Sequence, residues 1–261
     1  MRTRFSRSIA GAGSIAGAAV LLILVLPSPS PLAARAPQQA TKPAPPAPRL
    51  PNGTPDFQGV LDGGGGVAAR NLKPGDTISL LPEAKKLMDS RMAQDDPEAN
   101  CLPAGIPRLV YPWRMVQSID GKYVFILFEG NIHSYRQIFL DGRKHLADPD
   151  PTWYGHSVGH WEGDTLVVDT VGFNDKFWFG ANGLPHTTQL HTIERFTRTD
   201  ANTMSYDITI IDPGAYAKPF TVQTKARYQP GWDLMEYICQ ENETSASAKH
   251  IKGKAGGASG Q

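Results

Sequence analysis

The chain has 261 residues, and its 26 basic and 25 acidic residues leave a formal net charge of +1. The basic residues are scattered rather than gathered into a stripe, which argues against nucleic acid as a partner. Hydrophobic residues make up 40% of the sequence, so one domain with a proper apolar core is expected.

The N-terminus has the composition of an export signal. Three Arg and no acidic residue stand within the first eight positions, and an apolar run of Gly, Ala and aliphatic residues follows from Ile9 to Leu26. This order predicts a signal at residues 1–36 and an exported protein, periplasmic or extracellular. Because the apolar run is about long enough to span a bilayer, an uncleaved signal that anchors the chain is the alternative. It is the only contact with a membrane that we expect.

Two flanking segments are expected to lack a fold of their own. Residues 37–55 are rich in Pro, Ala and Gln, a composition that buries too little apolar area to order itself, and they are predicted to be a disordered linker. Residues 245–261, rich in Gly, Lys and Ser, are predicted to be a disordered tail. A single domain is therefore expected over residues 56–244.

The first regular element predicted within the domain is a helix at Leu81–Ala93. Apolar residues recur there at helical spacing, Pro82 suits a first turn, and Asp95 to Pro97 ends the pattern. From Met115 onward the apolar period changes to two, which is typical of strands.

Short β-rich runs separated by Asp-Gly, Pro-Gly and similar turn signals fill the rest of the domain. In chain order the predicted strands are 115–117, 123–128, 132–140, 155–161, 165–173, 190–197, 204–211, 220–228 and 234–240. This predicts an all-β antiparallel meander of about eight strands, with one short helix before it. Such a meander forms either a sandwich or a closed or nearly closed barrel, lipocalin-like in shape. We favour the barrel because consecutive hairpins with few long crossovers are the simplest topology.

The two cysteines, Cys101 and Cys239, are far apart in sequence. In an exported chain they predict one disulfide that ties the start of the domain to its last strand. The alternative is a lone reactive thiol, but neither cysteine is flanked by a sequence typical of an activated one.

Residues 151–173 concentrate ionisable and aromatic side chains in one predicted hairpin, with two His, two Trp and three acidic residues. His156 and His160 are four residues apart, so on a straight strand they lie about 13 Å apart on one face and cannot both bind one metal ion. We therefore expect no metal and no cofactor. His186 and His191 flank a loop-to-strand transition and are interpreted as capping or surface hydrogen-bonding residues.

This hairpin also carries a family resemblance. The strings PTW, GHS, WEGDTLVVDT and GF within residues 151–173 resemble a block shared by exported, mostly uncharacterised proteins of environmental bacteria. The likeness extends through RQIF at 136–139, DGR at 141–143 and ERF at 194–196, and covers most of residues 101–242. The resemblance implies export, a β-rich domain and a shared site, and it implies no particular reaction.

Three carboxylates lie between apolar neighbours on predicted strands: Asp169, Glu194 and Glu236. Desolvation raises the pKa of such acids unless a cation compensates, and Arg136 and Arg195 are the natural partners. We predict that these five residues form the floor of a pocket and are the catalytic candidates. The alternative is a purely structural lattice, since a buried charge must be paired to be tolerated.

The mouth of this pocket is expected to bind the ligand through Trp153, Tyr154, His156 and Trp178, although such aromatic residues also serve as core packing. The leading hypothesis is a cofactor-free acid/base enzyme, a lyase or hydrolase acting on a small aromatic or sugar-like compound. One alternative is a non-catalytic, lipocalin-like ligand-binding protein. Another is an envelope-associated structural protein, which would use an exposed apolar patch or sheet edge for contacts.

Overall fold

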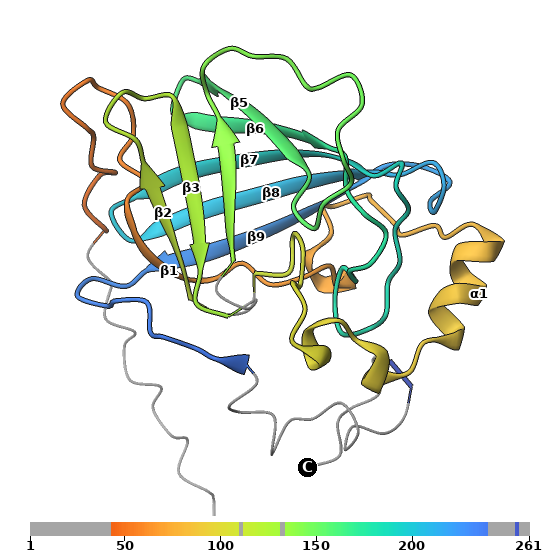
Figure 1. Ribbon diagram of the computed structural model, residues 1–261. Coiled ribbons are helices and arrows are strands. Elements are labelled where there is room, and N and C mark those ends of the chain that lie inside the picture. Colours follow the sequence, from red (N-terminus) through yellow and green to blue (C-terminus); the bar gives the residue numbers. More distant parts are fainter. Residues whose placement is uncertain (1–42, 110–111, 131–133, 240–253, 256–261) are drawn as a thin grey trace, which may run out of the picture. The chain divides into compact units, whose positions relative to one another are not determined.

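The computed structural model describes residues 43–109, 112–130, 134–239 and 254–255 (Figure 1). The predicted export signal at residues 1–36 lies outside these ranges, as does most of the predicted tail. Residues 43–55, expected in the linker, belong to the folded unit that begins at Pro43. The backbone N–H of Ala201, for example, donates a hydrogen bond of 2.8 Å to the carbonyl of Pro45. The folded part therefore starts earlier than the composition indicated.

Nine strands form one closed barrel, which confirms the predicted fold class (Figure 1). Each strand pairs with the next one in the chain, and the first pairs with the last. The strands are β1 Gly59–Gly63, β2 Trp113–Gln117, β3 Tyr123–Phe128, β4 Tyr135–Phe139, β5 His156–Glu162, β6 Thr165–Val171, β7 His191–Asp200, β8 Thr203–Ile211 and β9 Phe220–Tyr228.

The strand that closes the barrel is β1, which the sequence pattern missed. Leu61 of β1 lies opposite Trp113 of β2 on one side and Tyr228 of β9 on the other. The predicted strand at residues 234–240 is wrong, since residues 234–238 form no strand and Gln240 lies outside the described residues. The short, Gly-rich sequence of β1 hides its alternation, whereas the alternation after residue 233 has no partner strand.

The contact between β4 and β5 departs from the expected antiparallel meander. These two strands run parallel and share only two residue pairs, Ile138 with Ser157 and Phe139 with Val158. Parallel neighbours need a crossover connection, and residues 140–155 provide it. Tyr135 to Gln137 consequently pair with no residue of β5, so the ladder of backbone hydrogen bonds in the barrel wall is interrupted at this point.

The helix α1, Pro82–Ser90, follows β1 instead of preceding the whole barrel. Pro82 occupies its first turn as predicted, and Leu81 just before it donates a backbone hydrogen bond of 2.9 Å to Ala215. Short 3-10 turns lie at η1 Ala69–Asn71, η2 Ala93–Asp95 and η3 Glu98–Asn100. None of the helices in the described residues is both long and apolar enough to cross a membrane.

The inside of the barrel is filled by side chains that alternate along the strands. In β8, Met204, Tyr206, Ile208 and Ile210 are buried, whereas the residues between them are partly exposed. Further fully buried side chains from other strands are Trp113, Met115, Ile126 and Phe196. Inward-facing polar residues on β4 to β7 interrupt this apolar packing: Arg136, Ser157, Thr170, Thr192 and Glu194.

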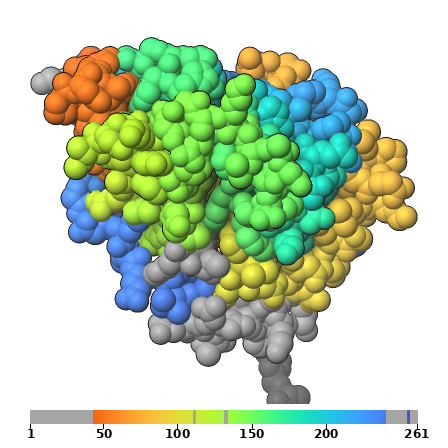
Figure 2. Space-filling model, turned by 45° about the horizontal axis from the view of Figure 1, so that its top comes forward, coloured from red at the N-terminus to blue at the C-terminus, as the bar shows by residue number. Residues whose placement is uncertain are grey.

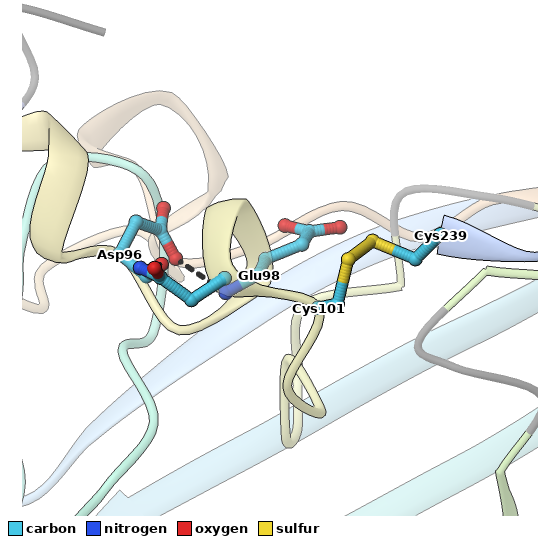
Figure 3. The surroundings of a disulfide bond; sticks show 5 residues. Asp96, Glu98, Cys101 and Cys239 are labelled. Atoms are coloured by element: carbon cyan, nitrogen blue, oxygen red, sulfur yellow. Dashed lines mark hydrogen bonds between the residues drawn. A yellow bond between two sulfur atoms is a disulfide. The ribbon is translucent and has the colours of Figure 1, made fainter. Parts of the chain in front are cut away.

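The predicted disulfide is confirmed: Cys101 and Cys239 are bonded across a sequence separation of 138 residues (Figure 3). Cys101 directly follows η3, and Cys239 lies in the segment after β9. The bridge therefore fastens two segments outside the nine strands, and it does not end on the last strand as expected.

A buried ion-pair cluster neighbours this disulfide. Arg108 donates a hydrogen bond of 2.8 Å to Asp96 and lies 2.6 Å from a carboxylate oxygen of Glu98. In Figure 3, Asp96 and Glu98 extend to opposite sides of the short turn that carries them. Burial raises the pKa of Glu98, although Arg108 opposes this rise. The cluster holds the segment before Cys101 in place.

Candidate functional site

The central feature of the barrel interior is an ion pair between Arg136 of β4 and Glu194 of β7, whose side chains are 2% and 0% exposed. Nη1 of Arg136 donates a hydrogen bond of 2.9 Å to Oε1 of Glu194, and Nη2 donates to Oε2. The hydroxyl of Tyr206 on β8 also donates to Oε1, at 2.8 Å. Strand alternation brings these side chains together because each occupies an inward position.

The remaining donors of Arg136 bind hydroxyl groups on the two strands between β4 and β7. Nε donates to Oγ of Ser157 at 3.0 Å, and Nη2 donates to Oγ1 of Thr170 at 2.8 Å. Thr170 in turn donates to Ser157 at 3.1 Å. Burial alone would lower the pKa of Arg136, but the facing Glu194 carboxylate outweighs it and the pKa is raised. The result is a closed, electrically neutral network.

A groove of about 610 Å³ opens where the barrel wall parts between β4 and β5. The yellow-green and green surface of β3, β4 and the following crossover faces the viewer in Figure 2. The aromatic and apolar walls of the groove include Phe139, Leu146, Trp153 and Tyr154. Arg136 and Ser157 of the inner network also line it, so the groove reaches from the surface to the polar interior.

Tyr154 is held at the inner side of this groove. Its hydroxyl lies 2.6 Å from Oγ of Ser134, and its ring stacks on Phe128 with 5.3 Å between centroids. Burial raises the pKa of Tyr154 to about 12, so the phenol keeps its proton at neutral pH. The next residue, Gly155, has a φ of +63°, and a Cβ there would lie 2.6 Å from the carbonyl oxygen of Val171. Only glycine fits this turn into β5.

His156 also lines the groove, at the start of β5. Its ring stacks on Phe139 with 5.3 Å between centroids, and its Nδ1 lies 3.0 Å from Nδ1 of His145. Burial, followed by the nearby His145 and Arg143, lowers the pKa of His156. Its imidazole is therefore neutral near pH 7 and can accept a proton.

Two further residues extend this contact into a chain on the outer face of the barrel. Nε2 of His145 lies 2.9 Å from Oδ1 of Asp169, and Nε2 of His191 lies 2.9 Å from the same oxygen. Sequence reasoning missed His145, which lies in an aperiodic crossover, and treated His191 as a surface residue. His191 and Asp169 occupy outward positions on neighbouring strands, which is a signal that could have linked them.

The five predicted floor residues do not form one site. Arg136 and Glu194 meet inside the barrel, but Asp169 lies on the outer face with His145 and His191. Arg195 is exposed and lies 2.9 Å from Glu162, and Glu236 is exposed in the segment after β9. Arg195 follows an inward residue directly, so alternation turns it outward. The prediction that Asp169 faces the interior was wrong because its apolar neighbours Val167 and Val171 also face outward.

The structure brings the residues predicted for the mouth of the pocket together in the groove, with one exception. Trp153, Tyr154 and His156 line the groove, as expected for a ligand-binding rim. Trp178 is 4% exposed, lies under the guanidinium of Arg91 at 4.8 Å and is not among the residues that line the groove.

Among the residues that the structure describes, no group of three or more His, Cys, Asp and Glu side chains is arranged to hold a metal ion. Comparison of the chain with protein-family models, curated proteins and solved structures found no match. Its function is therefore argued from the geometry of the groove.

Proposed function

We propose that the groove between β4 and β5 binds a small aromatic or sugar-like molecule, and that the exported protein acts on it as a cofactor-independent acid/base enzyme, a lyase or hydrolase. The observation that carries this proposal is the pairing of a neutral imidazole, His156, with a protonated phenol, Tyr154, in one groove of about 610 Å³.

The composition of the groove fits such a ligand. Phe139 and Trp153 offer flat apolar surfaces on which a ring can pack. Gln137 and Asp150 supply polar groups for the hydroxyls of a phenol or a sugar. Apolar walls with a few convergent polar groups are the usual make-up of a small-molecule site.

The two ionisable side chains that line the groove, His156 and Tyr154, have complementary roles. The imidazole of His156 takes a proton from the bound molecule, because its lowered pKa keeps it unprotonated near neutral pH. The hydroxyl of Tyr154 donates a hydrogen bond to the negative charge that this transfer leaves behind. The Arg136–Glu194 network acts as the rigid floor, since its charges are already paired with one another.

A non-catalytic binding protein is the second candidate. It is favoured by the same buried network, because the predicted acid Glu194 is completely buried and both of its carboxylate oxygens already accept hydrogen bonds, from Arg136 and Tyr206. This candidate shares the groove and its ligand class, and it lacks turnover.

A ligand screen separates these candidates. Phenols and monosaccharides are titrated into the full chain, and saturable binding is followed by tryptophan fluorescence and ligand-observed NMR. We expect binding that weakens at least about tenfold in Trp153→Ala, and turnover that falls about 100-fold or more in His156→Gln with binding retained. His160→Gln, an exposed histidine on the same strand, is the matched control and should behave like the wild type.

Binding without product would establish the binding protein, and the absence of binding by any tested phenol or sugar would remove the groove as a site. We also propose that the chain is exported and belongs with the bacterial proteins that its 151–173 block resembles. Mass spectrometry of the mature N-terminus, after expression in a bacterium with an intact secretion pathway, tests export. A chain retained whole in the cytoplasm would contradict it.

A further inference from the structure

We propose that His145, Asp169 and His191 are positioning residues for His156, a hydrogen-bonded chain that keeps the proton of His156 on Nδ1 and its Nε2 free to accept a proton in the groove. This inference rests on the proposed function of the groove and names the residues that would make His156 an effective base.

The proton positions follow from the chemistry of the acceptor. An ionised carboxylate only accepts hydrogen bonds, so Nε2 of His145 and Nε2 of His191 must each carry the proton directed at Oδ1 of Asp169. A neutral His145 then has a bare Nδ1. Because this Nδ1 lies 3.0 Å from Nδ1 of His156, the proton between them belongs to His156.

The consequence for His156 is a defined tautomer. With its proton on Nδ1, the ring carries a lone pair on Nε2, and the structure gives Nε2 no hydrogen bond from the residues it describes. His156 lines the groove, so this free nitrogen belongs to the side chain that a bound molecule meets. An orienting partner on one ring nitrogen commonly sets the chemistry of the other.

The residues of this hydrogen-bonded chain come from several elements of the barrel. His156, Asp169 and His191 lie on the three consecutive strands β5, β6 and β7, at positions that face outward. His145 comes from the crossover that the parallel β4–β5 pairing requires. Two hydrogen bonds, of 3.0 and 2.9 Å, join the crossover to β5 and β6, and a third, of 2.9 Å, joins β6 to β7.

The chain also provides a place for the proton after transfer. Nε2 of His156 takes a proton from the bound molecule, whose bonding electron pair stays behind as an anion. The Nδ1 proton of His156 then passes to Nδ1 of His145, and the resulting imidazolium lies against the Asp169 carboxylate. Reversal of both transfers returns the proton to the bound molecule, so the same hydrogen-bonded chain also allows His156 to act as an acid.

The charged and titratable groups around His156 come from the crossover and from β6 and β7. The crossover contributes Asp141, Arg143, His145 and Asp150, of which Arg143 is paired with Asp141 at 2.8 Å. β6 contributes Asp169, and β7 contributes His191. Arg143 opposes protonation of His156, and Asp169 compensates a proton that has reached His145.

Long-range ¹H–¹⁵N NMR of the full chain labelled at histidine tests the inference without a substrate. We expect the Nδ1–H tautomer for His156 and the Nε2–H tautomer for His145 and His191. In Asp169→Asn the signals of His145 and His156 should both shift, with His156 moving toward the Nε2–H form. Glu162→Gln is the matched control, since it removes the carboxylate from another His–acid pair, His160 at 3.1 Å, and should change only the His160 signals.

A wild-type His156 with its proton on Nε2 would overturn the inference, as would unchanged His145 and His156 signals in Asp169→Asn. Once a substrate is known, Asp169→Asn should lower kcat at least about tenfold with little change in KM, and should shift the acid limb of the pH profile. If only the inference about the positioning residues is wrong, the wild type still binds the ligand saturably. Failure of the proposed function instead removes ligand binding from the wild type, whatever the tautomers are.

Discussion

Thr170 of β6 and Thr192 of β7 lie directly opposite each other on the inner face of the barrel, and both are completely buried. The hydroxyl of Thr170 accepts a hydrogen bond from Arg136 and donates one to Ser157. The hydroxyl of Thr192 has no hydrogen-bond partner among the described residues. Two identical side chains on neighbouring strands therefore differ in whether their buried hydroxyl is hydrogen-bonded.

We expect Thr192→Val to raise the free energy of unfolding by about 1 kcal/mol, because valine has the same shape and removes a buried hydroxyl that lacks a partner. Thr170→Val should lower it by about 2 kcal/mol, because a charged donor loses its acceptor. Urea unfolding followed by tryptophan fluorescence measures both. Equal effects of the same sign would show that the two hydroxyls do not differ in this way.

The buried pair of Arg136 and Glu194 should be far more sensitive to loss of its carboxylate than the surface pair of Arg195 and Glu162, which also involves β7. Glu194→Gln leaves the guanidinium without its counter-charge inside the barrel, and we expect a loss of about 3 to 5 kcal/mol in the free energy of unfolding. Glu162→Gln, which removes the exposed partner of Arg195, should change the free energy of unfolding little, because solvent screens an exposed ion pair. Chemical denaturation of both variants checks this contrast, and similar losses would contradict it.

His186 should make the protein less stable in mild acid. His186 is 2% exposed, its ring lies tilted by 36° against that of Phe177 with 3.8 Å between centroids, and burial lowers the pKa of His186 from 6.5 to about 4. Between these two values the unfolded chain binds a proton that the folded chain does not. The free energy of unfolding therefore falls as the pH falls from about 6.5 to about 4, by roughly 3 kcal/mol from this residue.

Unfolding free energies measured across this pH range test the role of His186. His186→Phe keeps an aromatic ring beside Phe177 and removes the titrating group, so its stability should depend less steeply on pH than that of the wild type. His160→Gln, at a side chain that is 64% exposed, should keep the wild-type slope. A slope that is unchanged in His186→Phe would assign the acid sensitivity to other groups.

The disulfide should contribute stability without defining the barrel. Replacing Cys101 and Cys239 together by Ser opens a loop closed across 138 residues, and we expect a loss of roughly 4 to 5 kcal/mol in the free energy of unfolding. The far-ultraviolet circular dichroism spectrum should stay unchanged, because neither cysteine lies on a strand. A reducing agent should reproduce the loss in the wild type and have no effect on the double variant. A loss of strand signal would show that the bridge is needed for the barrel itself.

The sequence alone determined the fold class and the borders of most strands. Runs such as β8 and β9 alternate apolar and polar residues between turn signals, and such local patterns carry over into the structure because side chains in a strand alternate between two faces. The burial of Glu194 followed from the same alternation, and Arg136 was predicted as the cation that a buried carboxylate needs. The cysteine count, read with the predicted export signal, predicted the disulfide.

Tertiary structure alone decided which face of a strand is inside and which distant residues meet. β6 carries valines on both faces, so only its register between β5 and β7 turns Asp169 outward and Thr170 inward. His145 has no periodic context, and the parallel pairing of β4 with β5 is what carries it to His156 and Asp169. Local periodicity specifies strands, whereas closure of the barrel fixes their register, and a shift of one residue would exchange the two faces.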